Sequence, residues 1–162
     1  MNYYLSGEIT DKVLIDFINF TNEYKENNIN IFINSVGGNL AISKGLVYII
    51  NQEPIRFKLI ALSGIYSSAF TMFLECKCEK IILDNCKGMY HLSHIDLNIS
   101  TNKKGTYFED EFIKSQLDYY YNEEINFGSK LNLTQSQMIN LKAGKEIFFN
   151  TKQLRELIKL EF

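Results

Sequence analysis

Short apolar segments alternate with segments of helical periodicity in the first half of the chain, and this alternation constrains the fold more than any other feature. The residues "INIFIN" (29–34) and "RFKLIALSG" (56–64) have the length and the apolar content of buried strands. Between them, "LAISKGLVYIINQ" (40–52) repeats apolar residues at helical spacing. A strand, a helix and a second strand in this order predict parallel pairing and an α/β core.

The remaining segments are predicted from the same patterns. A helix is expected over 11–24 after a Thr10 cap, a short helix over about 68–75, and a long amphipathic helix over 106–131, which follows a polar loop at 100–105. Strands are expected in "KIILD" (80–84) and around "GMYHL" (88–92), and the chain finishes as helix, strand and helix over 133–144, 146–150 and 151–162. With no internal repeat or linker in the sequence, we expect a single domain over residues 1–162.

The composition excludes several classes of function. Hydrophobic residues make up 46% and charged residues 22%, as in ordinary globular proteins, and the formal charge of -2 does not suit nucleic acid. The longest uninterrupted apolar run, "LVYII" (46–50), is too short to span a bilayer, and the start of the chain has no signal-peptide pattern. We therefore expect a soluble, cytoplasmic protein that binds neither nucleic acid nor membrane.

The cysteines do not predict a disulfide framework or a metal. Cys76, Cys78 and Cys86 form an odd set in a chain without a secretory signal, and small buried hydrophobes are the simplest interpretation. Together with His91 and His94 the first two could form a zinc site, but C-x-C is not the usual spacing of a zinc knuckle. We expect no metal and no cofactor.

Two glycines follow the strand predicted over 29–34. In "NSVGGN", Gly37 and Gly38 lie between that strand and the next helix. Paired glycines at such a place allow backbone N–H groups to face a ligand without a side chain in the way. A tight strand-to-helix turn needs the same residues for conformation alone, and the sequence leaves both interpretations open.

Two adjacent serines lie at the end of the next strand. In "SGIYSSAF", Ser67 and Ser68 stand where the helix over 68–75 begins, so either one could serve as its N-cap. Alternatively, one hydroxyl is a nucleophile at a helix N-terminus. Such a nucleophile needs a base, and the chain has two histidines, His91 and His94, at or just past the end of the strand around 88–92. Both could also be ordinary surface residues.

Taken in order, these segments resemble the ClpP family, the proteolytic subunits of the Clp protease, within the crotonase-like fold group. "INIFINSVGGN" is similar to the family's I-x-x-Y-I-N-S-P-G-G segment, with Val36 at the proline. "GIYSSAF" is similar to G-x-A-A-S-M-G, which places Ser68 at the serine. "DNCKGMYHLS" is similar to P-N-S-x-x-M-I-H-Q-P, which places His91 at the histidine. The opening segment "YYLSGEI" resembles the family's first strand.

This resemblance implies an α/β fold of repeated β-β-α units with a projecting handle helix, in a handle region over about 100–131. It also implies a serine endopeptidase in which Ser68 attacks the scissile carbonyl and His91 takes its proton, with Ser67 as the reserve candidate. Glu146 stands where the family has aspartate, and a glutamate can orient a histidine as well. The backbone N–H groups of Gly38 and Ala69 would form the oxyanion hole, and the edge at Gly37 and Gly38 would hold the substrate.

The resemblance further implies partners. The substrate would be an unfolded polypeptide, cleaved inside a homo-oligomer of stacked heptameric rings, a tetradecamer that an AAA+ unfoldase can feed. Since Met1 almost abuts the first strand, we expect little engagement with an unfoldase. A catalytically weak or inactive ring subunit is the alternative function, and Glu146 favours it. Two other functions of the same fold group compete with these. A crotonase-type acyl-CoA enzyme is disfavoured because its chemistry does not require a serine nucleophile and a histidine base, the roles of Ser68 and His91. A signal-peptide peptidase is disfavoured because the sequence has no membrane segment.

Overall fold

The computed structural model describes residues 1–93 and 107–162, and side chains for all of these except 107–113. The chain divides into two compact units. The first unit comprises Met1–Tyr90 and Ile147–Phe162, and the second comprises His91–Glu146. The second unit is therefore an insertion between two consecutive strands of the first. Part of the expected handle region, residues 100–106, lies outside the described residues.

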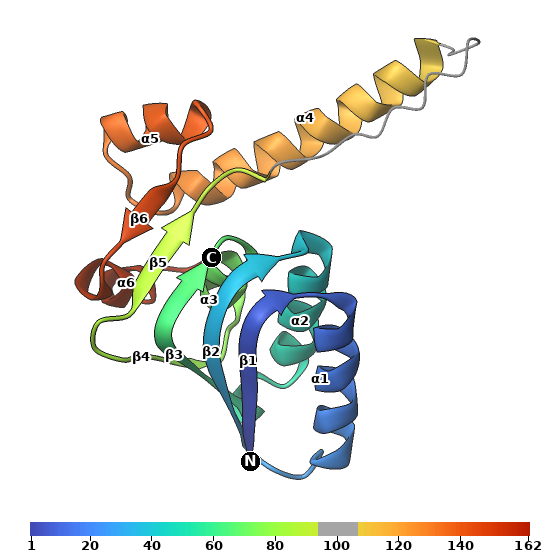
Figure 1. Cartoon of the computed structure of the whole chain (residues 1–162), viewed down its shortest axis with the longest axis vertical. Coiled ribbons are helices and arrows are strands. Elements are labelled where there is room, and N and C mark those ends of the chain that lie inside the picture. Colours follow the sequence, from blue (N-terminus) through green and yellow to red (C-terminus); the bar gives the residue numbers. More distant parts are fainter. Residues whose placement is uncertain (94–106) are drawn as a thin grey trace. The chain divides into compact units, whose positions relative to one another are not determined.

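The first unit is built on a mixed β-sheet (Figure 1), which has six strands in the described residues. The strands are β1 (Asn2–Ile9), β2 (Ile29–Gly38), β3 (Phe57–Tyr66), β4 (Glu79–Ile82), β5 (Lys87–Tyr90) and β6 (Ile147–Phe149). The order is β1-β2-β3-β5-β6, with β4 also paired to β3. All pairs are parallel except β5 with β6. The parallel α/β core expected from the sequence is confirmed.

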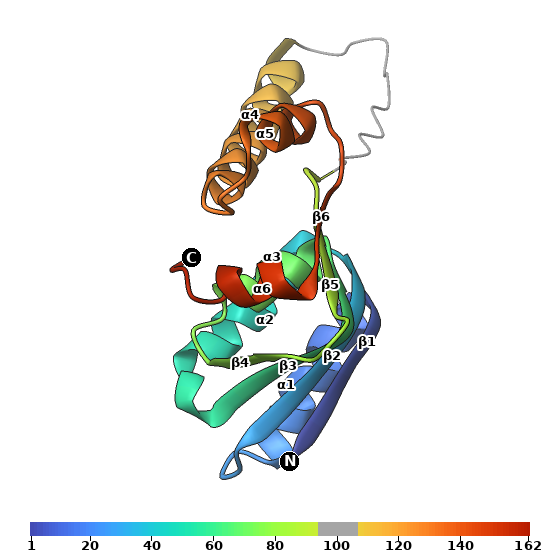
Figure 2. The same ribbon diagram turned by 90° about the vertical axis from the view of Figure 1, so that its left-hand side faces the viewer.

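The helices of the first unit pack on one face of this sheet, as Figure 2 shows. They are α1 (Asp11–Glu23), α2 (Leu40–Gln52), α3 (Ser68–Glu75) and α6 (Thr151–Leu157), with a 3-10 turn at Pro54–Arg56. Alternate residues of β1, β2 and β3 point into the core against the helices, and these side chains are almost fully buried: Leu5, Ile9, Ile29, Ile31, Ile33, Phe57, Leu59 and Ala61. Period-2 alternation, rather than burial of both faces, is therefore the pattern of these strands.

The helix boundaries follow local signals in the sequence. The helix predicted over 40–52 has those bounds, because the Asn39 side chain accepts a hydrogen bond from Ile42 N and so caps the first turn. Thr10 occupies the N-cap position of α1, as expected, although its side chain makes no capping hydrogen bond. The last carbonyl groups of α1 have no acceptor role within the helix, and a side chain from outside the helix binds them. Arg56 Nη2 donates hydrogen bonds to the carbonyl oxygens of Thr21 and Tyr24 at 2.7 and 2.8 Å.

Two strands are longer than the sequence predicted. The strand expected over 29–34 continues to Gly38, and the strand expected over 56–64 continues to Tyr66. The pairing of β1 with β2 and the pairing of β2 with β3 each contain a register shift. Between β2 and β3, Ile33 pairs with Ala61 whereas Ser35 pairs with Ile65. Because β3 bulges at this place, its apolar pattern breaks before the strand ends. The bulge brings the two extended strand ends next to one another.

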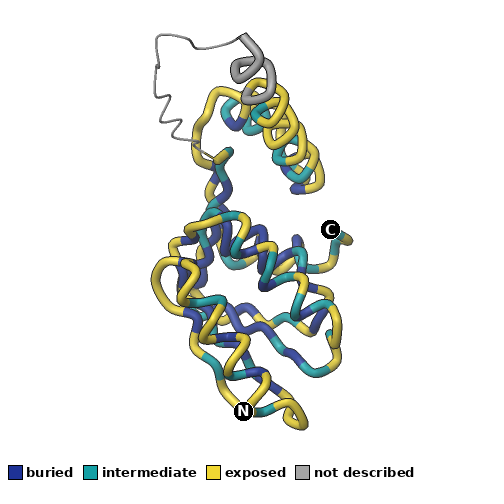
Figure 3. The backbone as a smooth tube through the Cα atoms, turned by 90° about the vertical axis from the view of Figure 1, so that its right-hand side faces the viewer, coloured by how far each residue is buried: buried dark blue, intermediate teal, exposed yellow. Residues whose placement is uncertain are grey.

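The second unit contains the long helix α4 (Tyr107–Ser129) and the short helix α5 (Gln135–Lys142). Thr134 and Gln137 form a capping box at the start of α5. Leu131 and Leu141 are buried, whereas most described side chains of α4 are exposed or half-buried (Figure 3). The predicted long helix is confirmed. No helix in the described ranges is long and apolar enough to cross a membrane.

The sheet face opposite the helices carries a row of apolar side chains. Tyr4 pairs with Phe32, Phe32 with Ile60, and Ile60 with Ile81, so the four residues form one line across four strands. Tyr4 is 66% exposed, and its ring stacks on that of Phe32 at 5.2 Å between centroids. We call Tyr4, Phe32, Ile60 and Ile81 the apolar row.

Candidate active site at the carboxyl edge of the sheet

The sheet topology brings the predicted site segments to one edge. Strands β2, β3 and β5 are parallel neighbours, and their carboxyl ends lie at Gly38, Tyr66 and Tyr90. Ser67 directly follows β3, and His91 directly follows β5. In open α/β sheets, the carboxyl ends of the strands are where binding sites form.

Gly37 lies directly against the serine turn. A Cβ at Gly37 would be 2.6 Å from the Tyr66 carbonyl oxygen, 2.7 Å from Ser67 Cβ and 3.0 Å from Ser68 N. The backbone of Gly37 also has a φ of +91°, which side chains disfavour. A tight turn alone would need only the positive φ. The close approach to the backbone of Tyr66 and Ser68 is a second requirement for glycine, and it joins the two predicted site segments.

Gly38 and Ser35 fix the conformation of this turn. Gly38 has a φ of +145°, and a Cβ there would be 2.4 Å from the Ile9 carbonyl oxygen. Ser35 is buried, its hydroxyl donates to the Gly7 carbonyl at 2.6 Å, and it accepts from Gly37 N at 3.1 Å. The Gly37 N–H is therefore already engaged, which leaves Gly38 as the glycine of the pair to consider as an oxyanion donor. We did not single out Ser35 from the sequence, although it directly follows Asn34 in the quoted segment.

Ser67 occupies the junction between β3 and α3. It has φ 55° and ψ -126°, a conformation that is rare for any residue with a side chain. Its N–H donates to the Met89 carbonyl of β5 at 2.8 Å, and its carbonyl accepts from Phe70 N at 2.9 Å. The side chain is half-buried. Hydrogen bonds to β5 and to α3 thus hold Ser67 in its unusual conformation.

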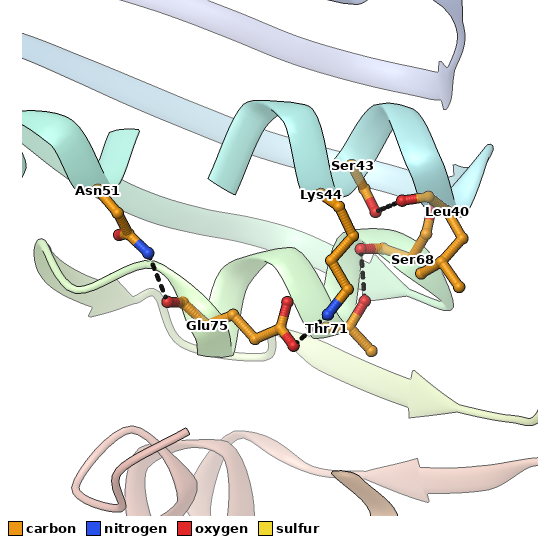
Figure 4. A network of polar contacts seen from close by, with 7 residues as sticks. All are labelled: Leu40, Ser43, Lys44, Asn51, Ser68, Thr71 and Glu75. Atoms are coloured by element: carbon orange, nitrogen blue, oxygen red, sulfur yellow. Dashed lines mark hydrogen bonds and ion pairs between the residues drawn. The ribbon is translucent and has the colours of Figure 1, made fainter. Parts of the chain in front are cut away.

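Ser68 is the first residue of α3 and is only 4% exposed. Its hydroxyl oxygen is buried and has no hydrogen-bond partner in the described part of the chain. Figure 4 shows Ser68 in the polar network of α2 and α3, where its carbonyl oxygen accepts from the Thr71 hydroxyl at 3.0 Å. A buried hydroxyl without a partner is uncommon in native proteins and calls for a physical explanation.

Ala69 is fully buried and is the second residue of α3. The N–H groups of Ser68 and Ala69 belong to the first turn, where the helix itself offers no acceptor. Both therefore carry the partial positive charge of a helix N-terminus. The helix can stabilise negative charge that develops beside it, whichever serine reacts.

His91 and Glu146 are the first and last residues of the second unit. Each is joined through the backbone to the carboxyl edge, because Tyr90 pairs with Ile147 in the antiparallel ladder of β5 and β6. Within the second unit, His91 Nδ1 lies 2.7 Å from the Leu92 carbonyl oxygen. Ser93 N donates to Glu124 Oε2 of α4 at 2.9 Å, so the residues after His91 are anchored to that helix.

The cysteines lie away from this edge. Cys76, Cys78 and Cys86 are free and buried, as predicted. The thiol of Cys76 donates a hydrogen bond to Cys78, which raises the pKa of Cys76 and lowers the pKa of Cys78. In the ranges that the structure describes, no three His, Cys, Asp or Glu side chains are grouped as metal ligands. His94 lies outside these ranges.

A surface hollow of about 560 Å³ lies at the opposite edge of the sheet. It is lined by residues at the amino ends of β2, β3 and β4, among them Asn28, Arg56 and Lys77. The lining of this hollow includes none of the predicted site residues. Lys58 and Glu79, which also line it, pair with each other at 2.9 Å. We therefore assign the hollow no part in the candidate chemistry.

No protein-family model and no curated protein matches this chain. Solved structures match it over nearly its whole length. A peptidase from Plasmodium falciparum is similar with a TM-score of 0.69 and 17% identity, over 99% of this chain and 93% of that one. A mutant ClpP1 from Listeria monocytogenes is similar with a TM-score of 0.71 and 16% identity, over 98% of this chain and 88% of that one. The chain therefore has a ClpP-like α/β fold, as its sequence motifs predicted.

Proposed function

We propose that this protein is a serine peptidase that cleaves unfolded polypeptides. The paired serines supply the nucleophile, His91 acts as the base, and Glu146 orients its imidazole. The oxyanion hole is formed by backbone N–H groups of the Gly38 turn and of the first turn of α3. The observation that carries the proposal is the contact of Gly37 with the backbone of Tyr66 and Ser68.

The chemistry follows from this contact. An oxyanion hole needs donors that already point to one place before the reaction begins, because reorganisation during the reaction would cost free energy. The Gly37 contact fixes the double-glycine turn against the start of α3, where N–H groups lack helical acceptors. The removal of one such donor typically costs about 3 to 4 kcal/mol of transition-state stabilisation. The ClpP-like fold supports the same assignment.

We also propose that the protein works as a homo-oligomer of stacked heptameric rings whose chamber admits unfolded substrate. The apolar row supports an oligomer, since its exposed members Tyr4 and Ile81 favour contact of this sheet face with another protein surface. Sequestration in a chamber would restrict access to extended chains. Selectivity would then depend less on a specificity pocket.

The test is covalent labelling of the full chain with a fluorophosphonate probe, together with turnover of a fluorogenic peptide. We expect an adduct on one of the paired serines. His91→Ala should lower kcat/KM by about 10³-fold or more, because the alcohol then loses its base. The control is His94→Ala, the other histidine of the chain, which should remain within about 3-fold of the parent, less than 1 kcal/mol.

Glu146 has its own test. Glu146→Gln keeps the shape of the side chain but removes the charge that stabilises the imidazolium, so turnover should fall by about 10²-fold or more. Glu146→Asp keeps the charge and should remain within about 10-fold. Equal activity of Glu146→Gln and the parent would remove Glu146 from the mechanism.

A second candidate is a ring subunit that keeps the fold without the chemistry. The burial of Ser68 favours it, since a serine that is only 4% exposed and whose hydroxyl oxygen is buried is poorly placed to meet a substrate. This candidate predicts an assembled, folded protein that forms no fluorophosphonate adduct and turns over no peptide. An adduct on either serine would exclude it.

A further inference from the structure

We propose that Ser67, and not Ser68, is the nucleophile of this site. The inference rests on the proposed function, because it names the alcohol that the peptidase would use. It differs from the comparison of "GIYSSAF" with the family motif G-x-A-A-S-M-G, in which Gly64 matches the first glycine and Ser68 matches the serine. The backbone conformation, the surroundings of the two side chains and the available N–H donors all favour the residue one position earlier.

The backbone of Ser67 is strained in a way that a simple turn does not need. Among the described non-glycine residues, positive φ occurs at Ser67, Asn85 and Asn132. Asparagine tolerates the left-handed region, but Ser67 combines φ 55° with ψ -126°, which lies outside that region. Glycine would adopt this conformation freely. A serine held there presents a hydroxyl on a sharp strand-to-helix turn, the arrangement that exposes a nucleophile in hydrolases.

The surroundings of Ser67 suit an attacking group. Its Cβ faces the Gly37 backbone, since a Cβ at Gly37 would lie 2.7 Å away. The absence of a side chain at Gly37 therefore leaves the space in which the Ser67 side chain sits. The backbone of Ser67 is also fixed by its hydrogen bonds to Met89 and Phe70, so β5 and α3 set the point from which its side chain projects. Preorganisation of this kind favours reaction.

Ser68 has the opposite surroundings. As the first residue of α3 it points into the packed side of the helix, where its hydroxyl oxygen is buried without a partner in the described ranges. An attacking hydroxyl there would have to leave this packing before it could meet a carbonyl carbon. Its backbone N–H, however, lies close to the Gly37 backbone. With Ser67 as nucleophile, the N–H of the following residue, Ser68, becomes the oxyanion donor in place of that of Ala69.

The reaction is then written with Ser67. Its Oγ forms a bond to the scissile carbonyl carbon while its proton passes to the imidazole of His91. The carbonyl π electrons move to the oxygen, which is held by the Ser68 N–H. Collapse of this adduct breaks the carbon–nitrogen bond, and the imidazolium returns the proton to the leaving amine. Water then attacks the acyl-enzyme, with the same imidazole as base, and releases the carboxylic acid product and free Ser67.

The experiment maps the fluorophosphonate adduct by mass spectrometry on the assembled full chain and on two matched variants. We expect the adduct on Ser67 in the parent chain. Ser67→Ala should abolish labelling and lower kcat/KM by about 10³-fold or more, whereas Ser68→Ala should retain the Ser67 adduct. Ser67→Ala should also lose at least about 10²-fold more activity than Ser68→Ala, a difference of about 2.7 kcal/mol.

A third variant separates catalysis from folding. Ser67→Gly removes both the hydroxyl and the strain, so it should raise Tm by about 2–5 °C while abolishing the adduct. An adduct on Ser68, or labelling that survives Ser67→Ala and disappears in Ser68→Ala, would overturn the inference and leave the proposed peptidase intact. No adduct on either serine, together with no peptide turnover, would overturn both.

Discussion

The contact between Gly37 and the serine turn allows a sharp test of the active-site geometry, through the substitution Gly37→Ala. The added Cβ would lie 2.6 Å from the Tyr66 carbonyl oxygen, whereas ordinary contact begins at 3.4 Å. One of the two backbones must therefore move by 3.4 − 2.6 = 0.8 Å. Because both partners are backbone and not the ends of flexible side chains, the collision cannot be relieved by a rotamer change.

Gly7→Ala is the matched control. Gly7 also has a positive φ, +80°, but a Cβ there would have nothing within 4 Å. The control thus carries only the cost of a left-handed alanine, about 1–2 kcal/mol. Gly37→Ala carries this cost and the collision, for which we expect a total of about 2–4 kcal/mol. At about 3 °C per kcal/mol, Tm should fall by about 3–6 °C for Gly7→Ala and about 6–12 °C for Gly37→Ala.

Activity should separate the two variants further. A shift of nearly 1 Å at a reacting group costs on the order of 10²-fold in rate, so kcat/KM of Gly37→Ala should fall by about that factor below 25 °C, where the protein remains folded. Gly7→Ala should stay within about 3-fold of the parent, less than 1 kcal/mol. The measurements are thermal unfolding by circular dichroism and peptide turnover. If both variants lose the same stability and activity, the Gly37 contact does not position the site.

Three further predictions concern stability and assembly. Arg56→Ala removes the donors to the Thr21 and Tyr24 carbonyls, and it should lower the free energy of unfolding in urea by about 2–3 kcal/mol. Arg56→Lys should recover only part of this stability. An unchanged free energy of unfolding in Arg56→Ala would show that water replaces the guanidinium. Burial raises the pKa of Cys86 above its ordinary 9.0, so the folded state keeps this proton longer than the unfolded chain, and stability should fall as pH rises above 9.0. Cys86→Ala should make that fall shallower, and an unchanged slope would contradict the assignment. Tyr4→Lys, at 66% exposure on the apolar row, should shift the protein toward smaller species in light scattering, whereas Tyr48→Lys, at 67% exposure on α2, should not; equal effects would remove the apolar row from assembly.

The local elements were largely predictable because their signals are local. Helices α2 and α3 begin and end where the apolar period and the flanking residues indicated, and the capping side chain of Asn39 marks the start of α2. The parallel core followed from the strand, helix and strand order, which permits few topologies. The sequence marks the double glycine and the double serine as candidate site segments because each comes at the end of a predicted strand.

The sequence by itself thus determined the elements, their parallel arrangement and the two turns at which chemistry could occur. Only the tertiary structure decided how these turns fit together. The extension of β2 and β3 depends on a bulge after which Ser35 pairs with Ile65. The local sequence pattern of either strand does not predict which residues pair across such a bulge. The strained backbone of Ser67 and the burial of Ser68 depend on contacts with Met89 of β5, with α2 and with Gly37, which come from distant parts of the chain. Two adjacent serines are alike in sequence, and non-local packing alone makes them physically different.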